Sequence, residues 1–241
     1  MQILKAEGVT KNFGGLTAVG NVDLTVDDGI ILGLIGPNGA GKTTLFNLIS
    51  GANKLDSGTI TYNGERISGK KPYHICRAGI GRTFQIAKNF PGMSVRENAM
   101  MGAMFGKAGQ SRKKAEQEID EILEFVGLAD QSDRHVPDLT LASQKRVEVA
   151  RALATKPQLL MLDETMAGLN PTEVEDAMEL VRKIRDSGIT IVMIEHVMRA
   201  IMNICDRIIV LHHGEKIADG TPEEISTNSA VIAVYLGSGR G

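Results

Sequence analysis

The chain has 241 residues, 42% hydrophobic, 23% charged and 4% aromatic, so aliphatic side chains must fill the core of one α/β domain or of a core with an inserted subdomain. Its 27 basic and 29 acidic residues give a net charge of −2, without the basic excess of a protein that binds nucleic acid nonspecifically. The charge balance therefore predicts a protein that binds no nucleic acid. No apolar run reaches the ~18–20 residues that span a bilayer, no secretory signal opens the chain, and two cysteines cannot build a disulfide scaffold. These three features predict a cytoplasmic protein.

Apolar runs and turn signals mark the first elements. Residues 30–35 predict a buried strand, and residues 42–50 predict a helix that ends before Gly51. Residues 57–67 alternate around Asn63-Gly64, a strong hairpin signal. The N-terminal third therefore mixes strands with one helix.

The middle of the chain is mostly helical. Polar breaks separate three predicted helices, at 93–105, 111–128 and 143–155. In the second helix, apolar residues share one face at three- and four-residue spacing: Ile119, Ile122, Leu123 and Val126. Beyond it, the predicted elements are a strand at 159–162, a helix at 171–187, and strands at 190–194, 207–211 and 215–218.

Apolar strands that alternate with helices predict an α/β fold, with a largely parallel sheet covered on both faces. The helical stretch interrupts this sheet. We therefore predict one domain over 1–241, with a core at 1–85 and 156–241 and an inserted helical subdomain at 86–155.

The motif G-x-x-x-x-G-K-[ST] lies between the predicted strand at 30–35 and the following helix. Its glycines let backbone N–H groups wrap a phosphate, and the helix N-terminus adds a positive dipole end. Lys42 is placed to reach the β- and γ-phosphates and Thr43 to ligate Mg²⁺. A glycine-rich turn without a ligand is the plainer alternative, but the flanking elements favour nucleotide binding. The residues expected to bind ATP are Gly36, Pro37, Asn38, Gly39, Ala40, Gly41, Lys42, Thr43 and Thr44.

Two carboxylates end the buried strand at 159–162. They are delivered to the carboxyl edge of the sheet, where α/β proteins bind ligands. Asp163 is suited to hold Mg²⁺ through water, and Glu164 to orient or deprotonate the attacking water. A plain Asp-Glu turn is the alternative for this pair considered alone.

With these residues in this order, the chain resembles the ATP-binding subunits of ABC transporters over nearly its whole length. The resemblance implies a P-loop NTPase (RecA-like) core with an N-terminal antiparallel β region. It also implies that Gln85 contacts Mg²⁺ and the attacking water, that His196 contacts the γ-phosphate, and that Phe13 stacks on adenine, although a core or edge aromatic is the alternative for Phe13. The expected catalytic set is Lys42, Gln85, Glu164 and His196. Four further histidines are expected on the surface: His74, His135, His212 and His213.

The chain departs from the family at its LSGGQ signature, which opens the helix that closes on the partner subunit's ATP. Residues 139–143 read LTLAS instead. Thr140 keeps a hydroxyl for that ATP and Ser143 adds a polar contact, while Ala142 replaces a glycine and costs about 1–2 kcal/mol if the position is left-handed. Thr165 replaces the expected proline, and Asn170 the usual aspartate. Whether the altered signature supports full activity at the ATP site of the partner subunit stays open.

The stretches 80–102, 163–173 and 220–237 resemble the ATPase subunits of branched-chain amino-acid importers. In such importers two ATPase subunits, identical or paralogous, drive membrane permeases that an extracytoplasmic binding protein supplies. The resemblance thus implies a place on the inner face of the membrane. Five side chains near the helical subdomain are expected either to line a permease-docking groove or to fill the core: Phe90, Met93, Met100, Met101 and Met104.

Two other functions stay open at this point. One is a soluble ABC ATPase in DNA repair or translation, although such relatives usually carry two cassettes or a long coiled coil. The other is a regulatory nucleotide-binding partner with low turnover, which the altered signature suggests.

Overall fold

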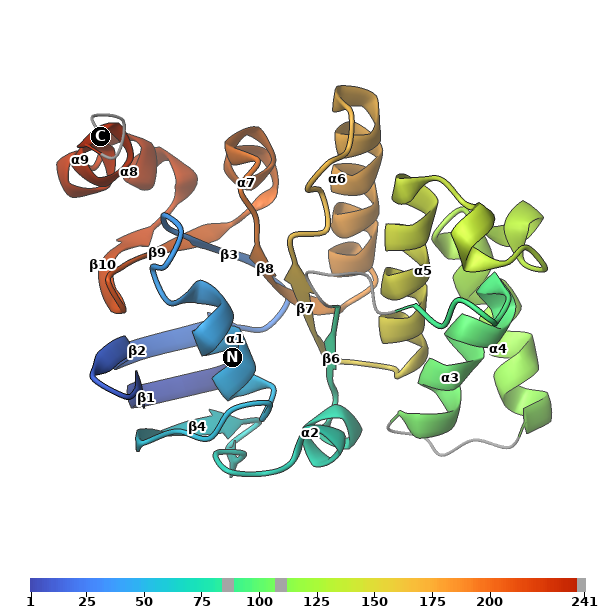
Figure 1. Ribbon diagram of the computed structural model, residues 1–241, viewed down its shortest axis with the longest axis horizontal. Coiled ribbons are helices and arrows are strands. Elements are labelled where there is room, and N and C mark those ends of the chain that lie inside the picture. The colour runs from blue at the N-terminus through green and yellow to red at the C-terminus, as the bar shows by residue number, and fades with distance from the viewer. Residues whose placement is uncertain (84–88, 107–111, 238–241) are drawn as a thin grey trace.

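The structure, a computed structural model, describes residues 1–83, 89–106 and 112–237, and in these ranges two β-sheets pack around helix α1 (Lys42–Ile49) (Figure 1). A four-stranded antiparallel sheet has the order β2-β1-β4-β5. Its strands are β1 (Gln2–Phe13), β2 (Leu16–Asp27), β4 (Ser57–Tyr62) and β5 (Glu65–Arg66). The predicted hairpin is confirmed, with Asn63 and Gly64 at φ 49° and 78° in the turn between β4 and β5.

The second sheet has six strands in the order β10-β9-β3-β8-β7-β6. Its strands are β3 (Ile31–Ile35), β6 (Ile80–Arg82), β7 (Leu159–Asp163), β8 (Thr190–Ile194), β9 (Arg207–His212) and β10 (Glu215–Gly220). All neighbouring pairs run parallel except β9 with β10. The mostly parallel sheet predicted from the sequence is confirmed.

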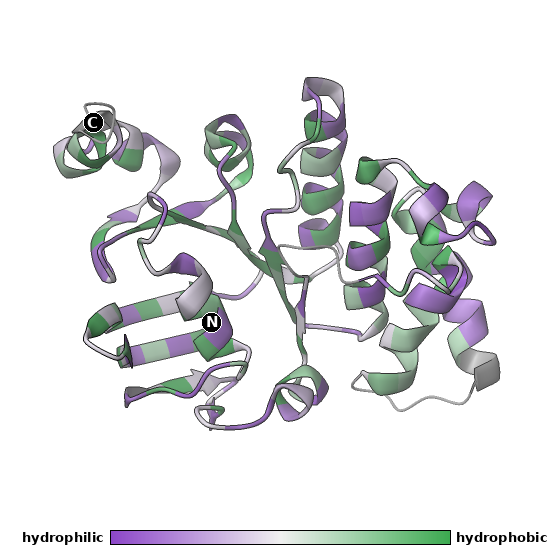
Figure 2. Ribbon diagram, viewed as in Figure 1, coloured by the Kyte–Doolittle hydropathy of each residue, from purple (hydrophilic) through white to green (hydrophobic). Residues whose placement is uncertain are grey.

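The central strands β3, β7 and β8 are buried at every residue, and they are among the most hydrophobic parts of the ribbon (Figure 2). Because strand side chains alternate, each strand supplies two cores. Leu32 and Leu34 pack with α1 and the antiparallel sheet. Ile31 and Ile35 face the other side, in a cluster with residues of helices α5, α6 and α7. Burial on both faces explains the unbroken apolar runs.

Helices cover the sheet and extend to the end of the described chain (Figure 1). They are α2 (Pro72–Ala78), α6 (Pro171–Asp186), α7 (Met198–Ile204), α8 (Pro222–Thr227) and α9 (Ser229–Gly237). Asn170 caps α6 in a reciprocal capping box with Glu173, which gives this residue a local structural role. No helix among the described residues has the length and apolar character needed to cross a membrane.

The helical insert lies beside the β6 end of the sheet (Figure 1). It contains α3 (Val95–Phe105), α4 (Arg112–Phe125), α5 (Leu141–Ala154) and the short 3-10 turns η1 (Ala129–Gln131) and η2 (Val136–Asp138). The predicted apolar face of α4 is confirmed at Ile119 and Leu123, which are buried, with Val126 just beyond the helix and Ile122 partly buried. The exact division at 86–155 stays a prediction.

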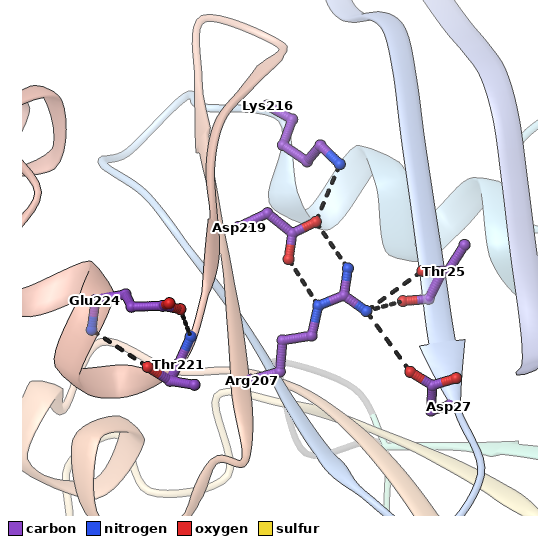
Figure 3. Close-up of polar contacts among 7 residues, drawn as sticks. All are labelled: Thr25, Asp27, Arg207, Lys216, Asp219, Thr221 and Glu224. Carbon is purple, nitrogen blue, oxygen red and sulfur yellow. Dashed lines mark hydrogen bonds and ion pairs between the residues drawn. The ribbon is translucent and has the colours of Figure 1, made fainter.

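Arg207 ties the two sheets together (Figure 3). From β9 it makes a bidentate ion pair with Asp219 of β10, at 2.7 and 2.8 Å. Its Nη1 also donates to the carbonyl and hydroxyl oxygens of Thr25 on β2, at 3.2 and 3.3 Å. Arg207 therefore links the antiparallel sheet to the edge of the parallel sheet.

Candidate functional site

The phosphate-binding motif forms the turn from β3 into α1. Gly36 and Gly41 have φ values of 149° and 100°. A Cβ on Gly36 would lie 2.1 Å from the carbonyl oxygen of Leu211, and a Cβ on Gly41 would lie 2.3 Å from that of Ala18. Both glycines are therefore required by backbone conformation and by close approach of neighbouring backbone.

Lys42 is the buried cation of this turn, with 6% of its surface exposed. Its Nζ donates to the carbonyl oxygens of Gly36 and Pro37, at 2.7 and 3.0 Å. Burial lowers the pKa of Lys42, and the carboxylates of Glu164 and Asp163 oppose that shift. The loop thus places an ammonium group at the start of α1, an arrangement suited to a polyphosphate.

A cavity of about 440 Å³ opens over this loop. It joins the motif to side chains from β7, β8 and the N-terminal strands. Its lining residues are Phe13, Leu16, Thr17, Ala18, Asn38, Gly39, Ala40, Gly41, Lys42, Thr43, Thr44, Glu164, His196 and His213. The structure therefore brings most of the sequence-predicted site together. Gly36, Pro37 and Asp163 are not in the lining.

Phe13 ends β1 at the mouth of the cavity and is 48% exposed. Its ring lies 5.4 Å from the Lys11 ammonium. An aromatic residue with half its surface exposed does not fill the core, so the core alternative for Phe13 is wrong. The exposed ring offers a face on which a base can stack.

His213 is a cavity residue that the sequence analysis did not assign to the site. It occupies the turn between β9 and β10, where Gly214 N donates to the carbonyl oxygen of Ala40 at 3.1 Å. Like His74 and His135 it is exposed, as expected, whereas His212 is half-buried. Because His213 is far in sequence from the phosphate-binding motif, no local pattern predicts that it lies beside that motif in the fold.

Asp163 ends β7 with 1% of its surface exposed, and its Oδ2 accepts from Arg82 Nη2 at 2.9 Å. Arg82 also donates to Asn47 Oδ1 at 2.7 Å and Ser50 Oγ at 2.8 Å, so it joins β6 and β7 to α1. Burial raises the pKa of Asp163, and Arg82 opposes the rise. Asp163 Oδ1 is buried with no hydrogen-bond partner among the described residues. Arg82 was not predicted as a site residue, because its partner Asp163 lies 81 residues further along the chain.

Glu164 and His196 follow neighbouring parallel strands and meet at their carboxyl ends. His196 Nε2 lies 2.9 Å from Glu164 Oε1. Glu164 has a left-handed backbone, with φ 53°, which its N–H stabilises by donating to the Ile194 carbonyl at 2.9 Å. Lys145 Nζ donates to the Glu164 carbonyl at 2.8 Å. The carboxylate is thus held against the imidazole within the cavity.

The altered signature forms the start of α5, outside this cavity. Thr140 is the N-cap, and its hydroxyl accepts from Ser143 N at 3.3 Å. Ala142 lies inside the helix and is not left-handed, so the strain considered for it does not arise. The Thr165 hydroxyl donates to Glu195 Oε1 at 3.3 Å, a hydrogen bond that proline at this position could not make. Gln85 lies outside the described residues.

A buried strand, a phosphate loop, a helix and a carboxylate–histidine pair at the sheet edge define a P-loop nucleotide-binding ATPase. The ABC transporter family model matches residues 19–167, and a model of the branched-chain amino acid ATP-binding cassette transporter matches residues 215–240. The chain therefore belongs to the ABC transporter family, as one of its ATPase subunits.

Relatives with curated names agree with this assignment. The chain is 39% identical to the high-affinity branched-chain amino acid transport ATP-binding protein BraF of Pseudomonas aeruginosa and 41% identical to LivG, of the same description, of Salmonella typhimurium. Each alignment covers 98% of both chains. The predicted resemblance is confirmed.

Solved structures confirm the fold. A nucleotide-free ATP-binding cassette of an ABC transporter superposes with a TM-score of 0.90 at 32% identity, over 98% of this chain and 99% of that one. A cassette in its ADP conformation gives a TM-score of 0.91 at 32% identity and the same coverage.

Proposed function

We propose that this subunit hydrolyses MgATP to power the import of branched-chain amino acids. The observation that carries the hydrolytic step is the Glu164–His196 pair, which shares one cavity with the phosphate loop. The substrate class rests on the printed descriptions of the relatives and on the match at residues 215–240. The chain then works at the inner, cytoplasmic face of the membrane.

Each side chain has a proposed task in ATP hydrolysis. Lys42 binds the β- and γ-phosphates, and the backbone of the loop surrounds them. Glu164 orients and deprotonates the attacking water, a contribution of about 10²–10⁴ in rate. His196 holds the Glu164 carboxylate and contacts the γ-phosphate, Gln85 contacts the attacking water, and Phe13 stacks on adenine.

The residues present fit a Mg²⁺ ion that arrives with the nucleotide. Asp163 Oδ1 is buried and has no hydrogen-bond partner in the described part of the chain, and Thr43, a hydroxyl-bearing residue, lines the cavity. Within the described ranges no group of three or more His, Cys, Asp or Glu side chains is arranged to hold a metal alone, so phosphate oxygens and water would complete the coordination of this ion. We propose Thr43, Gln85 and Asp163 as the protein's contacts to this ion, which neutralises phosphate charge when bound.

Two partner surfaces follow from this proposal. One surface contacts a second ATPase subunit, identical or paralogous. The start of α5 would contact the ATP bound to that subunit, through Thr140, Ala142 and Ser143. The permease docks in an apolar groove of about 610 Å³ between α2, α3 and α5. Phe90 and Met101 line this groove. Met93 and Met104 are not among its described lining residues, and Met100 packs against the core instead. The binding protein acts on the permease from outside.

Uptake by intact cells tests the function. Chromosomal Lys42→Ala should abolish uptake of labelled leucine, isoleucine and valine and leave lysine uptake unchanged. Normal leucine uptake in this strain would contradict the proposal. Loss of lysine uptake instead of leucine uptake would contradict the substrate class while keeping the transport role. The matched control is Lys70→Ala, an exposed lysine outside the cavity.

A further inference from the structure

Glu195 is a buried carboxyl group that the proposed mechanism does not use. It follows β8 directly, between Ile194 and His196, and only 2% of its surface is exposed. Its neighbour His196 is largely exposed and faces Glu164. Because successive side chains of an extended segment point in opposite directions, Glu195 turns into the protein interior.

The Glu195 carboxylate binds the turn that carries Glu164. Its Oε1 accepts from the backbone N–H of Met166 at 2.7 Å and from the hydroxyl of Thr165 at 3.3 Å. These are the two residues that follow Glu164 in the chain. One oxygen atom therefore fixes the exit of the turn, whereas the entrance is fixed by the bond from Glu164 N to the Ile194 carbonyl.

Lys145 connects the same turn to α5. Its Nζ donates to the carbonyl of Glu164 at 2.8 Å. Burial lowers the pKa of Lys145, and Glu195, Glu148 and Glu164 oppose that shift, with Glu195 the largest of the three. Lys145 lies five residues after Thr140, within the helix that is proposed to contact the partner's ATP. The turn is thus held from β8 by a carboxyl oxygen and from α5 by an ammonium group.

A carboxyl group at this position is costly for stability. Burial raises the pKa of Glu195 to about 7, and its Oε2 has no hydrogen-bond partner among the described residues. Removing a carboxylate from water costs several kcal/mol, and an apolar residue would fill the space without this penalty. The benefit is two hydrogen bonds that a hydrocarbon side chain cannot make, both to the turn that presents Glu164.

We propose that Glu195 is a positioning residue for ATP hydrolysis, which holds Thr165 and Met166 so that Glu164 faces His196, and that Lys145 anchors the same turn from α5. This inference rests on the proposed role of Glu164. It also means that the position of Glu164 depends on α5, the helix whose start is proposed to contact the ATP of the partner subunit. Neither Glu195 nor Lys145 lines the nucleotide cavity, so both act through Glu164.

The test measures steady-state ATP hydrolysis, nucleotide affinity and thermal unfolding of the full chain. Glu195→Ala should lower kcat at least ten-fold, with KM and ATP affinity within two-fold of the parent, because the turn loosens while the phosphate loop is untouched. Glu195→Gln keeps an oxygen acceptor for the Met166 N–H and should restore at least half of the parental kcat. A general loss of folding would instead lower kcat and affinity together.

A double-mutant cycle separates the shared action from two independent effects. Lys145→Met should also lower kcat, and the double variant with Glu195→Ala should lose little more than the more damaged single variant, because both act on one turn. The matched control is Glu118→Gln, a partly buried acid of α4 that pairs with Lys156 and should keep parental kcat and KM.

Each contrary result is distinct. Parental kcat in Glu195→Ala overturns the positioning role and leaves the ATPase function intact. Multiplicative losses in the double variant overturn the shared action of Lys145. A parent chain that binds ATP but never hydrolyses it, even in the assembled transporter, overturns the proposed function and the positioning role together.

Discussion

His196 Nε2 and Glu164 Oε1 lie 2.9 Å apart, at the carboxyl ends of two neighbouring parallel strands. The distance is that of a hydrogen bond, and the pair lines the same cavity as the phosphate loop. The imidazole therefore fixes the direction of the carboxylate before any water is activated. Substitution of one residue at a time therefore tests its role in hydrolysis separately from nucleotide binding.

Glu164→Gln should bind MgATP with parental affinity and lose about 10²–10⁴ in hydrolysis rate, because the amide keeps the size of the carboxylate but cannot take a proton. The stalled subunit should persist as an ATP-bound dimer. Single-turnover hydrolysis and size-exclusion chromatography with MgATP check both expectations. The control is Glu173→Gln in α6, and hydrolysis at the parental rate by Glu164→Gln would remove Glu164 as the base.

Arg82→Met should lower the free energy of unfolding by about 3–5 kcal/mol, because it leaves the carboxylate of Asp163 buried without its cation. Denaturant unfolding without nucleotide measures this loss. The matched control is Arg185→Met, which breaks partly exposed pairs with Asp186 and Asp206 and should change stability by about 1 kcal/mol or less. Adding Asp163→Asn to Arg82→Met should recover part of the loss. Equal effects of the two arginine variants would contradict the buried pair.

Phe13→Ala should weaken ATP binding by about 1–3 kcal/mol, the range for a base stacked on an aromatic ring. Phe13→Tyr should bind as the parent does, because it keeps the ring. Titration calorimetry with ATP and with inorganic triphosphate checks the cause, since only ATP carries a base. Phe125→Ala, at an exposed aromatic of α4, is the control. Equal weakening for both ligands would count against stacking.

Glu195 predicts a pH dependence of stability. Its pKa is 4.5 without the fold and about 7 within it, mainly because of burial. Since the folded protein binds the proton of Glu195 more tightly than the unfolded chain does, protonation of Glu195 favours the folded state. This contribution to stability is complete below pH 4.5 and is lost as the pH rises through 7. Lys145 and the buried thiol of Cys205 are the titratable groups that interact with the Glu195 carboxyl group, which also faces the Thr165 hydroxyl and the backbone N–H groups of Met166 and His196.

Glu195→Gln cannot ionise, so its stability relative to the parent should increase from pH 4.5 to 7 and then level off, by at most about 3 kcal/mol. Chemical unfolding at a series of pH values measures the difference. Glu215→Gln, at an exposed acid of β10, should show no such trend. A flat difference for Glu195→Gln would mean that Glu195 is not buried as the structure shows.

The sequence predicted the elements whose signals are local. The strand at 30–35, the phosphate loop and the Asn63-Gly64 turn each depend on a few adjacent residues, and all three are confirmed. Strands β1 and β2 were not bounded in advance, because their half-buried alternation is interrupted by register shifts. Helices α2 and α7, of seven residues each, are too short for a clear helical period.

The site was predictable where a motif exists and not where contacts are distant in sequence. Asp163 and Glu164 were proposed because they end an apolar strand, and His196 was proposed through the resemblance to ABC ATPases. Arg82 is 81 residues from its partner Asp163, and its ion pair depends on the parallel pairing of β6 with β7. Glu195 was overlooked because a charged residue beside a histidine gives no sign of burial. Such contacts depend on which strands are neighbours in the sheet, and local sequence patterns do not predict the strand order.

The central claim is that ATP lies with its phosphates on the loop at 36–43 and its γ-phosphate before Glu164 and His196. The most direct measurement is a crystal structure of the Glu164→Gln variant with MgATP. The account predicts a triphosphate wrapped by the backbone N–H groups of this loop, Mg²⁺ next to Thr43 and Asp163, and adenine on Phe13. An empty loop, or a triphosphate bound away from the side chains at 164 and 196, would contradict it.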